Sequence, residues 1–307
     1  MRDRAAPWLA AAQRQSEVAE VKSAPRPSPR PPVEARPTEL PVTSIVKLIR
    51  DPYEIYARLI LNLRKLDPLS PEPDVRMRGT ITHKIMEAFL KLGVPPDDPA
   101  ARDRLLHTAE QILASECPWP ATRHMWMARL AAVADWFLTT EVTRQTRATP
   151  TKFESKGKAT LDTLGFTLTA KADRIDLTDA GEAVIYDYKT GAPPTKKQQL
   201  TFEKQLLLEA AMIAHGIFDG IATKTVNGAA YIGLGSDPKE VPAPINEKPP
   251  DETWEEFHKL IAAWQDRGQG YTAKMALEKT SYEGDYDHLS RLGEWDTSSE
   301  PEPGDVG

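Results

Sequence analysis

Residues 166–190 read FTLTAKADRIDLTDAGEAVIYDYKT, and this stretch decides the fold. Residues 166–177 alternate between apolar and polar side chains, and residues 183–190 form a more apolar run, which together predict two β-strands. The polar segment between them contains Gly181 and is typical of a turn. We therefore expect an antiparallel hairpin that brings Asp173 back beside Asp187.

This hairpin indicates a metal site. Two neighbouring carboxylates repel each other unless a cation lies between them, and hard divalent cations such as Mg²⁺ prefer oxygen ligands. The side chains of Asp187 and Lys189 lie on the same face of their strand, about 7 Å apart. A lysine in this position can orient or help deprotonate a metal-bound water and can offset charge on a phosphate. The alternative is a solvated sheet edge with an Asp–Lys pair.

A predicted helix upstream offers a nitrogen ligand for the same site. The helix is expected from Gly79 to about Leu90, and it buries a stripe that includes Ile81 and Ile85. His83 lies on another side of this helix. A neutral imidazole there could complete an oxygen-rich metal shell, and the alternative is an ordinary surface histidine.

A downstream helix, expected over 198–215, places Gln205 and Glu209 one turn apart on the same face. A glutamine on a helix is usually solvated, so Gln205 gains a function only if this helix packs across the strand end that carries Lys189. Glu154, on the first strand of the sheet, is a candidate for a carboxylate that contacts the metal ligands without binding the metal itself.

A second carboxylate of the hairpin has a structural interpretation. Asp176 faces away from Asp173 if the strand is regular. We expect it to form a salt bridge with Arg174 or Lys171 rather than to bind a metal.

The composition is that of an ordinary globular protein, with 307 residues, 40% hydrophobic and 27% charged. Cys117 is the only cysteine, which excludes an internal disulfide, a four-cysteine zinc site and a cysteine-ligated iron–sulfur cluster. No apolar run reaches the roughly 18 residues of a membrane helix, so we expect no membrane association and a cytoplasmic location. The net charge is −6, but the acidic excess lies in residues 237–307, which leaves a nucleic-acid partner open.

The chain is expected to divide into four segments of different composition. They are a remnant helix of a preceding domain over 1–23, a proline-rich extended linker over 24–41, the folded domain over 42–296 and a disordered acidic tail over 297–307. Further helical patterns, over 100–116 and 120–145, come before the strands and predict a helical insertion.

Taken in order, Gly79-x-x-x-His83, Asp173-Arg-Ile-Asp176, Asp187-Tyr-Lys-Thr-Gly191 and Gln205-Leu-Leu-Leu-Glu-Ala210 resemble the RecB-like branch of the PD-(D/E)XK nuclease superfamily. Within this branch the sequence is most similar to AddB-type C-terminal nuclease domains, over roughly residues 7–296. The resemblance implies an α/β fold, with a restriction-endonuclease-like mixed sheet flanked by helices and a helical insertion. Glu209 stands where many relatives have a tyrosine.

The resemblance also implies roles for individual residues. His83, Asp173 and Asp187 would be metal ligands, with the backbone carbonyl of Tyr188 completing the shell. Lys189 would be the catalytic lysine, acting together with Asp173 and Asp187. Gln205 would lie near the DNA or near that lysine.

As a whole, the resemblance implies a Mg²⁺-dependent deoxyribonuclease, expected to be an exonuclease, with Mn²⁺ as a possible replacement and no iron–sulfur cluster. It would hydrolyse single-stranded DNA as part of a helicase–nuclease of the AddAB or RecBCD kind, with an AddA-like subunit as partner, in double-strand break repair by homologous recombination. Two alternatives remain open, namely a catalytically silent DNA-binding scaffold that holds a helicase, and a stand-alone metal-dependent nuclease.

Overall fold

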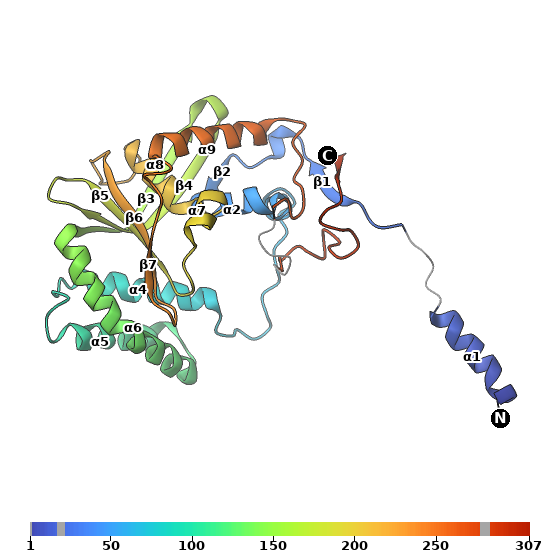
Figure 1. Cartoon of the computed structure of the whole chain (residues 1–307), viewed down its shortest axis with the longest axis horizontal. Coiled ribbons are helices and arrows are strands. Elements are labelled where there is room, and N and C mark those ends of the chain that lie inside the picture. Colours follow the sequence, from blue (N-terminus) through green and yellow to red (C-terminus); the bar gives the residue numbers. More distant parts are fainter. Residues whose placement is uncertain (1, 17–21, 277–282) are drawn as a thin grey trace.

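The computed structural model describes residues 2–16, 22–276 and 283–307. A mixed β-sheet forms the centre, and helices cover both of its faces (Figure 1). The helices on one face are α2 (Val42–Arg50), α8 (Gln205–Ala214) and α9 (Pro250–Gln265), and those on the other are α4 (Val75–Lys91), α5 (Ala101–Glu116) and α6 (Pro120–Arg147). Helices α5 and α6 are the predicted insertion between α4 and the strands.

The central sheet has six strands in the order β2-β4-β5-β6-β7, with β3 on the second edge of β4. They are β2 (Glu39–Pro41), β3 (Thr149–Leu161), β4 (Phe166–Leu177), β5 (Ala183–Lys189), β6 (Val226–Gly233) and β7 (Lys239–Pro242). Strand β5 runs antiparallel to β4 and parallel to β6, so the predicted hairpin is present inside a mixed sheet.

Strand β4 has three partners, and this determines where the sheet opens. Strand β3 pairs with β4 along its whole length. On the opposite edge, β2 pairs with residues 167–169 and β5 pairs with residues 174–177. Within the described chain, residues 170–173 therefore have no strand partner on that edge. Asp173 lies at the end of this gap, beside the first pair between β4 and β5.

The alternation of β5 separates the two halves of the core. Val184, Tyr186 and Tyr188 pack with α4, α5 and α6, whereas Ile185 packs with α2, α8 and α9. Asp187 belongs to the same face as Ile185 because successive side chains alternate. Local signals fix the helices around this core.

The start of α4 shows such a signal. The side chain of Asp74 accepts a hydrogen bond of 2.6 Å from the backbone N–H of Met77 and caps the helix. Helix α4 therefore begins at Val75, one turn before the predicted start at Gly79. The short helix α7 begins with a capping box in which the side chains of Thr195 and Gln198 each bond the other's backbone.

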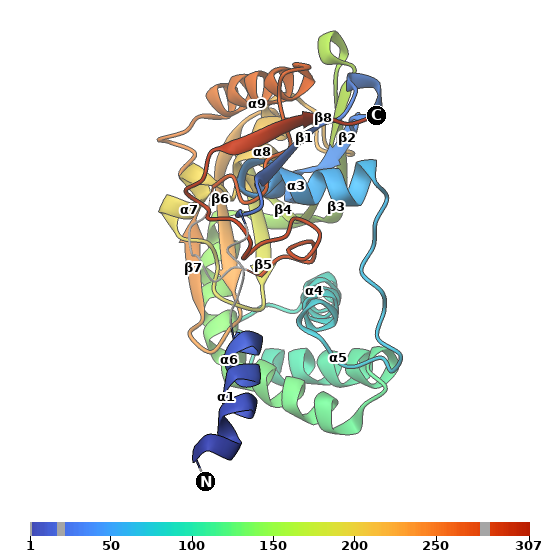
Figure 2. The same cartoon turned by 90° about the vertical axis from the view of Figure 1, so that its right-hand side faces the viewer.

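The proline-rich segment 24–41, expected to be an extended linker, packs against the domain. Strand β1 (Arg26–Arg30) pairs in parallel with β8 (Pro301–Asp305), and β2 joins the central sheet (Figure 2). Arg36 is buried and donates hydrogen bonds to several backbone carbonyls. Edge strands accept proline because one of their edges needs no ladder bonds. The expected disordered tail over 297–307 thus contains an ordered strand, which composition alone did not reveal.

Helix α1 (Arg2–Ser16) lies within the segment 1–23 where a helix is expected, and residues 17–21 lie outside the described part. Its residues 5–16 are exposed, and it stands apart from the sheet (Figure 1). The remaining short elements are η1 (Val33–Ala35), α3 (Pro52–Ile55), η2 (Tyr56–Ile60), η3 (Asp162–Leu164) and α7 (Lys196–Thr201).

A buried ionic network joins the helical insertion to the sheet. Arg174 is 0% exposed, and its guanidinium donates to both carboxylate oxygens of Asp176, at 2.7 and 2.6 Å. It also donates to both oxygens of Glu141 on α6, at 2.9 and 2.7 Å, and to the hydroxyl of Tyr188 at 3.2 Å. Burial raises the pKa of Glu141, but Arg174 and Arg144 outweigh burial and hold that pKa below its usual value. The expected pairing of Asp176 with Arg174 is confirmed.

Replacing Arg174 should destabilise the protein strongly. Arg174→Met leaves Glu141 and Asp176 buried without their main countercharge, and we expect a loss of about 3–5 kcal/mol in the free energy of unfolding. Urea denaturation followed by circular dichroism measures it. Arg147→Met, at the exposed end of α6, is the control and should cost less than about 0.5 kcal/mol. Equal losses in both variants would contradict the role of the network.

Candidate metal centre

The two carboxylates of the hairpin lie where β4 and β5 separate. Arg174 and Tyr186 form the last backbone pair between these strands, so Asp173 and Asp187 are the next residues beyond it. Oδ2 of Asp173 accepts a hydrogen bond of 2.9 Å from the backbone N–H of Tyr188. The Asp173 carboxylate therefore takes the place of a backbone acceptor and is held beside β5.

His83 reaches this point from α4. Its Nδ1 lies 3.2 Å from Oδ1 of Asp173, and its Nε2 lies 2.7 Å from the carbonyl oxygen of Tyr188. Burial lowers the pKa of His83, but the hydrogen bond and charge of Asp173, followed by the charge of Asp187, outweigh burial and raise that pKa above its usual value. Both ring nitrogens are therefore engaged, and the imidazole orientation is fixed.

Lys189, Asp187 and Gln205 form the second half of the site. Nζ of Lys189 lies 2.8 Å from Oδ2 of Asp187. Nε2 of Gln205 donates to Oδ1 of Asp187 at 2.6 Å, and its Oε1 accepts from Lys189 at 3.2 Å. From the sequence, Gln205 is expected to gain a function only if its helix packs across the strand end that carries Lys189. In the structure, α8 packs across the end of β5 and brings Gln205 to Lys189.

Burial and charge determine the protonation states in this half. Asp187 is 2% exposed, and burial raises the pKa of its carboxyl, which the charge of Lys189 opposes. Burial also lowers the pKa of Lys189, but the charge of Asp187 outweighs burial and raises that pKa above its usual value. Lys189 is therefore protonated at neutral pH.

Glu209 adds a buried acid behind this pair. It is 0% exposed, and its Oε1 accepts a hydrogen bond of 3.2 Å from Gln205. Its Oε2 has no hydrogen-bond partner among the residues that the structure describes. Burial, then the charges of Asp187 and Asp173, raise the pKa of Glu209 well above its usual value. This shift favours the neutral form of Glu209.

Glu154 completes a cluster of possible metal ligands. One donor atom from each of His83, Asp173 and Glu154 lies within 4.8 Å of the others. Glu154 lies on β3 between the pairs Phe153–Arg174 and Ser155–Ala172, which brings it to the level of Asp173, and it has a positive φ of 53°. A positive φ is uncommon outside glycine, and such residues gather at functional sites. Glu154 also forms an ion pair with Lys171.

The cluster overlaps with the predicted ligand set without matching it. His83 and Asp173 belong to both, whereas Asp187 is engaged by Lys189 and Gln205, and the carbonyl of Tyr188 faces His83. From the sequence, Glu154 is expected only to support the metal ligands, not to be one of them. The register between β3 and β4 is the feature that brings it to Asp173, and alternation within one strand does not reveal it.

The donor set fits a divalent cation. Two carboxylates supply the hard oxygen ligands that Mg²⁺ and Mn²⁺ prefer, and the imidazole is a common ligand of transition-metal ions. Glu154, Asp173 and His83 would hold such an ion. Asp187 lies on the adjoining strand and forms an ion pair with Lys189.

The fold and this cluster define an α/β protein with a candidate metal centre where two strands of a mixed sheet separate. A model of the PD-(D/E)XK nuclease superfamily matches residues 39–283. The chain belongs to this superfamily, and the restriction-endonuclease-like fold predicted from the sequence is confirmed. Nucleases of this superfamily use divalent metals, in agreement with the donor set.

The chain matches a part of longer relatives. It is 32% identical over 191 residues to an uncharacterised protein of Rickettsia conorii. This match covers 59% of this chain and 23% of the relative. It is 33% identical over 186 residues to an uncharacterised protein of Rickettsia bellii, with coverage of 60% and 22%. The chain thus spans less than a quarter of the length of these curated relatives. The crystal structure of SSO0001 matches with a TM-score of 0.31 and 11% identity, over 82% of this chain and 85% of that one.

In residues 2–16, 22–276 and 283–307, no helix is both long and apolar enough to cross a membrane.

Removing a carboxylate of the cluster should weaken metal binding. We expect Asp173→Asn and Glu154→Gln each to reduce Mn²⁺ affinity by roughly 10- to 100-fold or more. Replacing a residue that only hydrogen-bonds to a metal ligand already has an effect of this size. Isothermal titration calorimetry measures the affinity. Asp135→Asn, an exposed carboxylate on α6, is the control. If Glu154→Gln binds Mn²⁺ like the wild type and Asp187→Asn does not, Asp187 takes the place of Glu154 as ligand.

Metal binding should also depend on pH through His83. Because the folded-state pKa of His83 is raised, its protonation stabilises the metal-free fold below the unfolded-state pKa of about 6.5, and this contribution is lost as the pH rises through the folded-state pKa. A metal requires neutral imidazole, so Mn²⁺ affinity should increase over that same rise. The His83→Asn variant should bind more weakly and show a flatter pH profile, whereas identical profiles would remove His83 from the site.

Proposed function

We propose that the chain is a divalent-metal-dependent deoxyribonuclease domain that hydrolyses phosphodiester bonds of single-stranded DNA, with Mg²⁺ or Mn²⁺ as the ion. The observation that supports this most is the Lys189–Asp187 ion pair beside the His83–Asp173 contact, with both pairs at one strand opening. Membership of the PD-(D/E)XK nuclease superfamily supports the same chemistry.

The residues divide the work by position. Asp173, His83 and Glu154 would hold the ion, and Asp187 and the Tyr188 carbonyl remain further ligand candidates. When bound, the ion activates a water and stabilises negative charge on the phosphate. Lys189 keeps its proton, and its ammonium can orient the attacking water and offset phosphate charge. Gln205 positions Lys189 and Asp187 through a hydrogen bond to each.

We further propose that the domain belongs to a helicase–nuclease of the AddAB or RecBCD kind, acting as an exonuclease in the cytoplasm during double-strand break repair by homologous recombination. The motif order and the likeness to AddB-type domains support this assignment, as does the small share of the relatives' length that the chain spans. An AddA-like subunit would supply the motor, since the sequence has no phosphate-binding loop of the G-x-x-x-x-G-K type.

The nuclease activity should depend on Lys189 and on the metal. We expect Lys189→Ala and Asp187→Ala to reduce Mn²⁺- or Mg²⁺-dependent cleavage of a labelled single strand by about 100- to 1,000-fold, the usual effect of losing one group that stabilises transition-state charge. Binding of the same strand should persist, and chelation by EDTA should abolish cleavage in the wild type. Gel analysis of the products measures cleavage.

Lys259→Ala, an exposed lysine on α9, is the matched control and should cleave like the wild type. A wild-type protein that binds DNA but cleaves nothing, with or without a helicase subunit, would favour the silent scaffold. Robust cleavage without any association with a purified helicase subunit would favour the stand-alone nuclease.

A further inference from the structure

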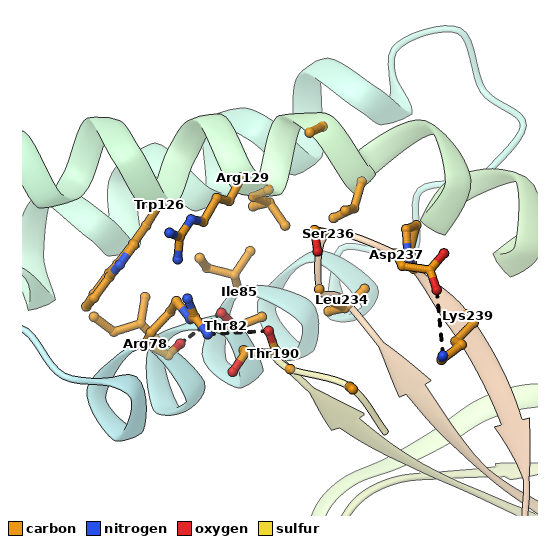
Figure 3. Close-up of a pocket in the computed structure, with 18 of the residues that line it drawn as sticks. Arg78, Thr82, Ile85, Trp126, Arg129, Thr190, Leu234, Ser236, Asp237 and Lys239 are labelled. Carbon is orange, nitrogen blue, oxygen red and sulfur yellow. Dashed lines mark hydrogen bonds and ion pairs between the residues drawn. The ribbon is translucent and has the colours of Figure 1, made fainter. Parts of the chain in front are cut away.

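A cavity of about 640 Å³ lies beside the candidate metal centre. It is bounded by α4 and α6 and by the loops that follow β5 and β6 (Figure 3). Its volume falls within the roughly 300–1,000 Å³ of sites for small ligands. None of the metal-cluster residues, His83, Glu154 and Asp173, lines it, so the cavity is distinct from the cluster.

The cavity begins one residue beyond the lysine of the site. Thr190 and Gly191, which follow Lys189 directly, line it. Arg78 donates a hydrogen bond of 3.4 Å to the carbonyl oxygen of Thr190, and it lies five residues before His83 on the same helix. The cavity therefore adjoins the end of β5, the strand that carries Asp187 and Lys189.

The cavity carries an excess of positive charge. Arg78 from α4 and Arg129 from α6 point toward each other across it (Figure 3). Within the described residues, neither guanidinium forms an ion pair with a carboxylate, and Nε of Arg78 is buried without a hydrogen-bond partner. The other charged lining residues, Asp237 and Lys239, lie 3.6 Å apart and neutralise each other.

The two guanidiniums also repel each other. Burial, followed by the charge of Arg129, lowers the pKa of Arg78. Two like charges held together in a partly buried place are relieved by an anion, and arginine presents a fork of donors that matches phosphate.

The wall between the arginines is apolar. Trp126 and Leu130 on α6 and Ile85 on α4 line the cavity together with Ile81. An apolar and aromatic wall beside cationic groups suits the flat face of a nucleobase joined to its phosphate. In a duplex the bases remain stacked on their neighbours, so only an unpaired nucleotide can place its base here.

We propose that this cavity binds one nucleotide of the single-stranded substrate, next to the phosphodiester at the metal centre, with Arg78 and Arg129 on its phosphate and the apolar wall on its base. The proposal rests on the nuclease function proposed above and adds the path of the strand, which runs from Lys189 past Thr190 and between α4 and α6. The phosphate bound there is either internal or terminal.

Arg129 gives the cleanest test because its side chain is exposed and its loss should leave the fold intact. Binding of a fluorescent oligodeoxynucleotide is followed by anisotropy in EDTA, over a series of salt concentrations. Arg129→Ala should weaken binding by roughly tenfold, the loss of one charge-assisted hydrogen bond. It should also reduce the slope of log affinity against log salt by about 0.7, which corresponds to one phosphate contact on a single strand.

Arg104→Ala, which removes an exposed arginine from the neighbouring α5 outside the cavity, is the matched control and should leave affinity and slope unchanged. Trp126→Leu should weaken binding without changing the slope, because a ring contact releases no counterion. Trp126 is 7% exposed, so circular dichroism must confirm that this variant folds. If it does not fold, Arg129→Ala decides the question alone.

The source of the phosphate is separated by three substrates of equal sequence, namely a linear strand with a 5′-phosphate, one with a 5′-hydroxyl and a circular strand. A slope change on all three assigns an internal nucleotide, and a change confined to the 5′-phosphate strand assigns a terminal one.

The proposal is overturned if Arg129→Ala binds every strand with the affinity and slope of the wild type. Failure of the nuclease function has a different signature, since the wild type would then bind DNA and cleave nothing with Mn²⁺ or Mg²⁺. The two proposals can therefore fail separately.

Discussion

The separation of β4 and β5 after the Arg174–Tyr186 pair is the constraint on which the site depends. Beyond this pair the backbone of β5 needs a new acceptor, and the Asp173 carboxylate provides it by bonding the N–H of Tyr188. A side chain that replaces a backbone acceptor is held by the sheet itself, which removes the need for a dedicated loop. The imidazole of His83 contacts one group on each strand, the carboxylate of Asp173 on β4 and the carbonyl of Tyr188 on β5.

Tyr188 connects this opening to the helical insertion. Its backbone groups contact Asp173 and His83, whereas its hydroxyl accepts a hydrogen bond from Arg174 in the buried network. Arg174 in turn bonds Glu141 on α6. The insertion is therefore anchored to the strand that carries the site, and α6 supplies one wall of the adjacent cavity. Disruption of the Arg174 network would therefore displace both β5, which carries the site, and α6, which lines the cavity.

The sequence predicted the elements that depend on local patterns. The hairpin, the helices that carry His83 and Gln205 and the Asp176–Arg174 pair follow from alternation, helical periodicity and turn residues. The sequence could not assign Glu154 to the metal cluster. Its position beside Asp173 depends on the register between β3 and β4 and on its positive φ, and neither can be read from the local sequence pattern. The packing of residues 24–41 and the strand over 301–305 were missed for a related reason. Their composition suits a linker and a tail, and only pairing between distant segments orders them.

Glu209 adds a buried acid behind the pair formed by Asp187 and Lys189. Asp187 and Lys189 form one compensated pair, and a third buried charge behind Gln205 would disturb it. Burial and the neighbouring Asp187 and Asp173 raise the pKa of Glu209 well above its usual value, which favours its neutral form. A neutral carboxyl can accept from Gln205 without competing for Lys189. In its neutral form Glu209 thus provides an uncharged hydrogen-bonding group behind Gln205, and the ammonium of Lys189 remains paired with Asp187.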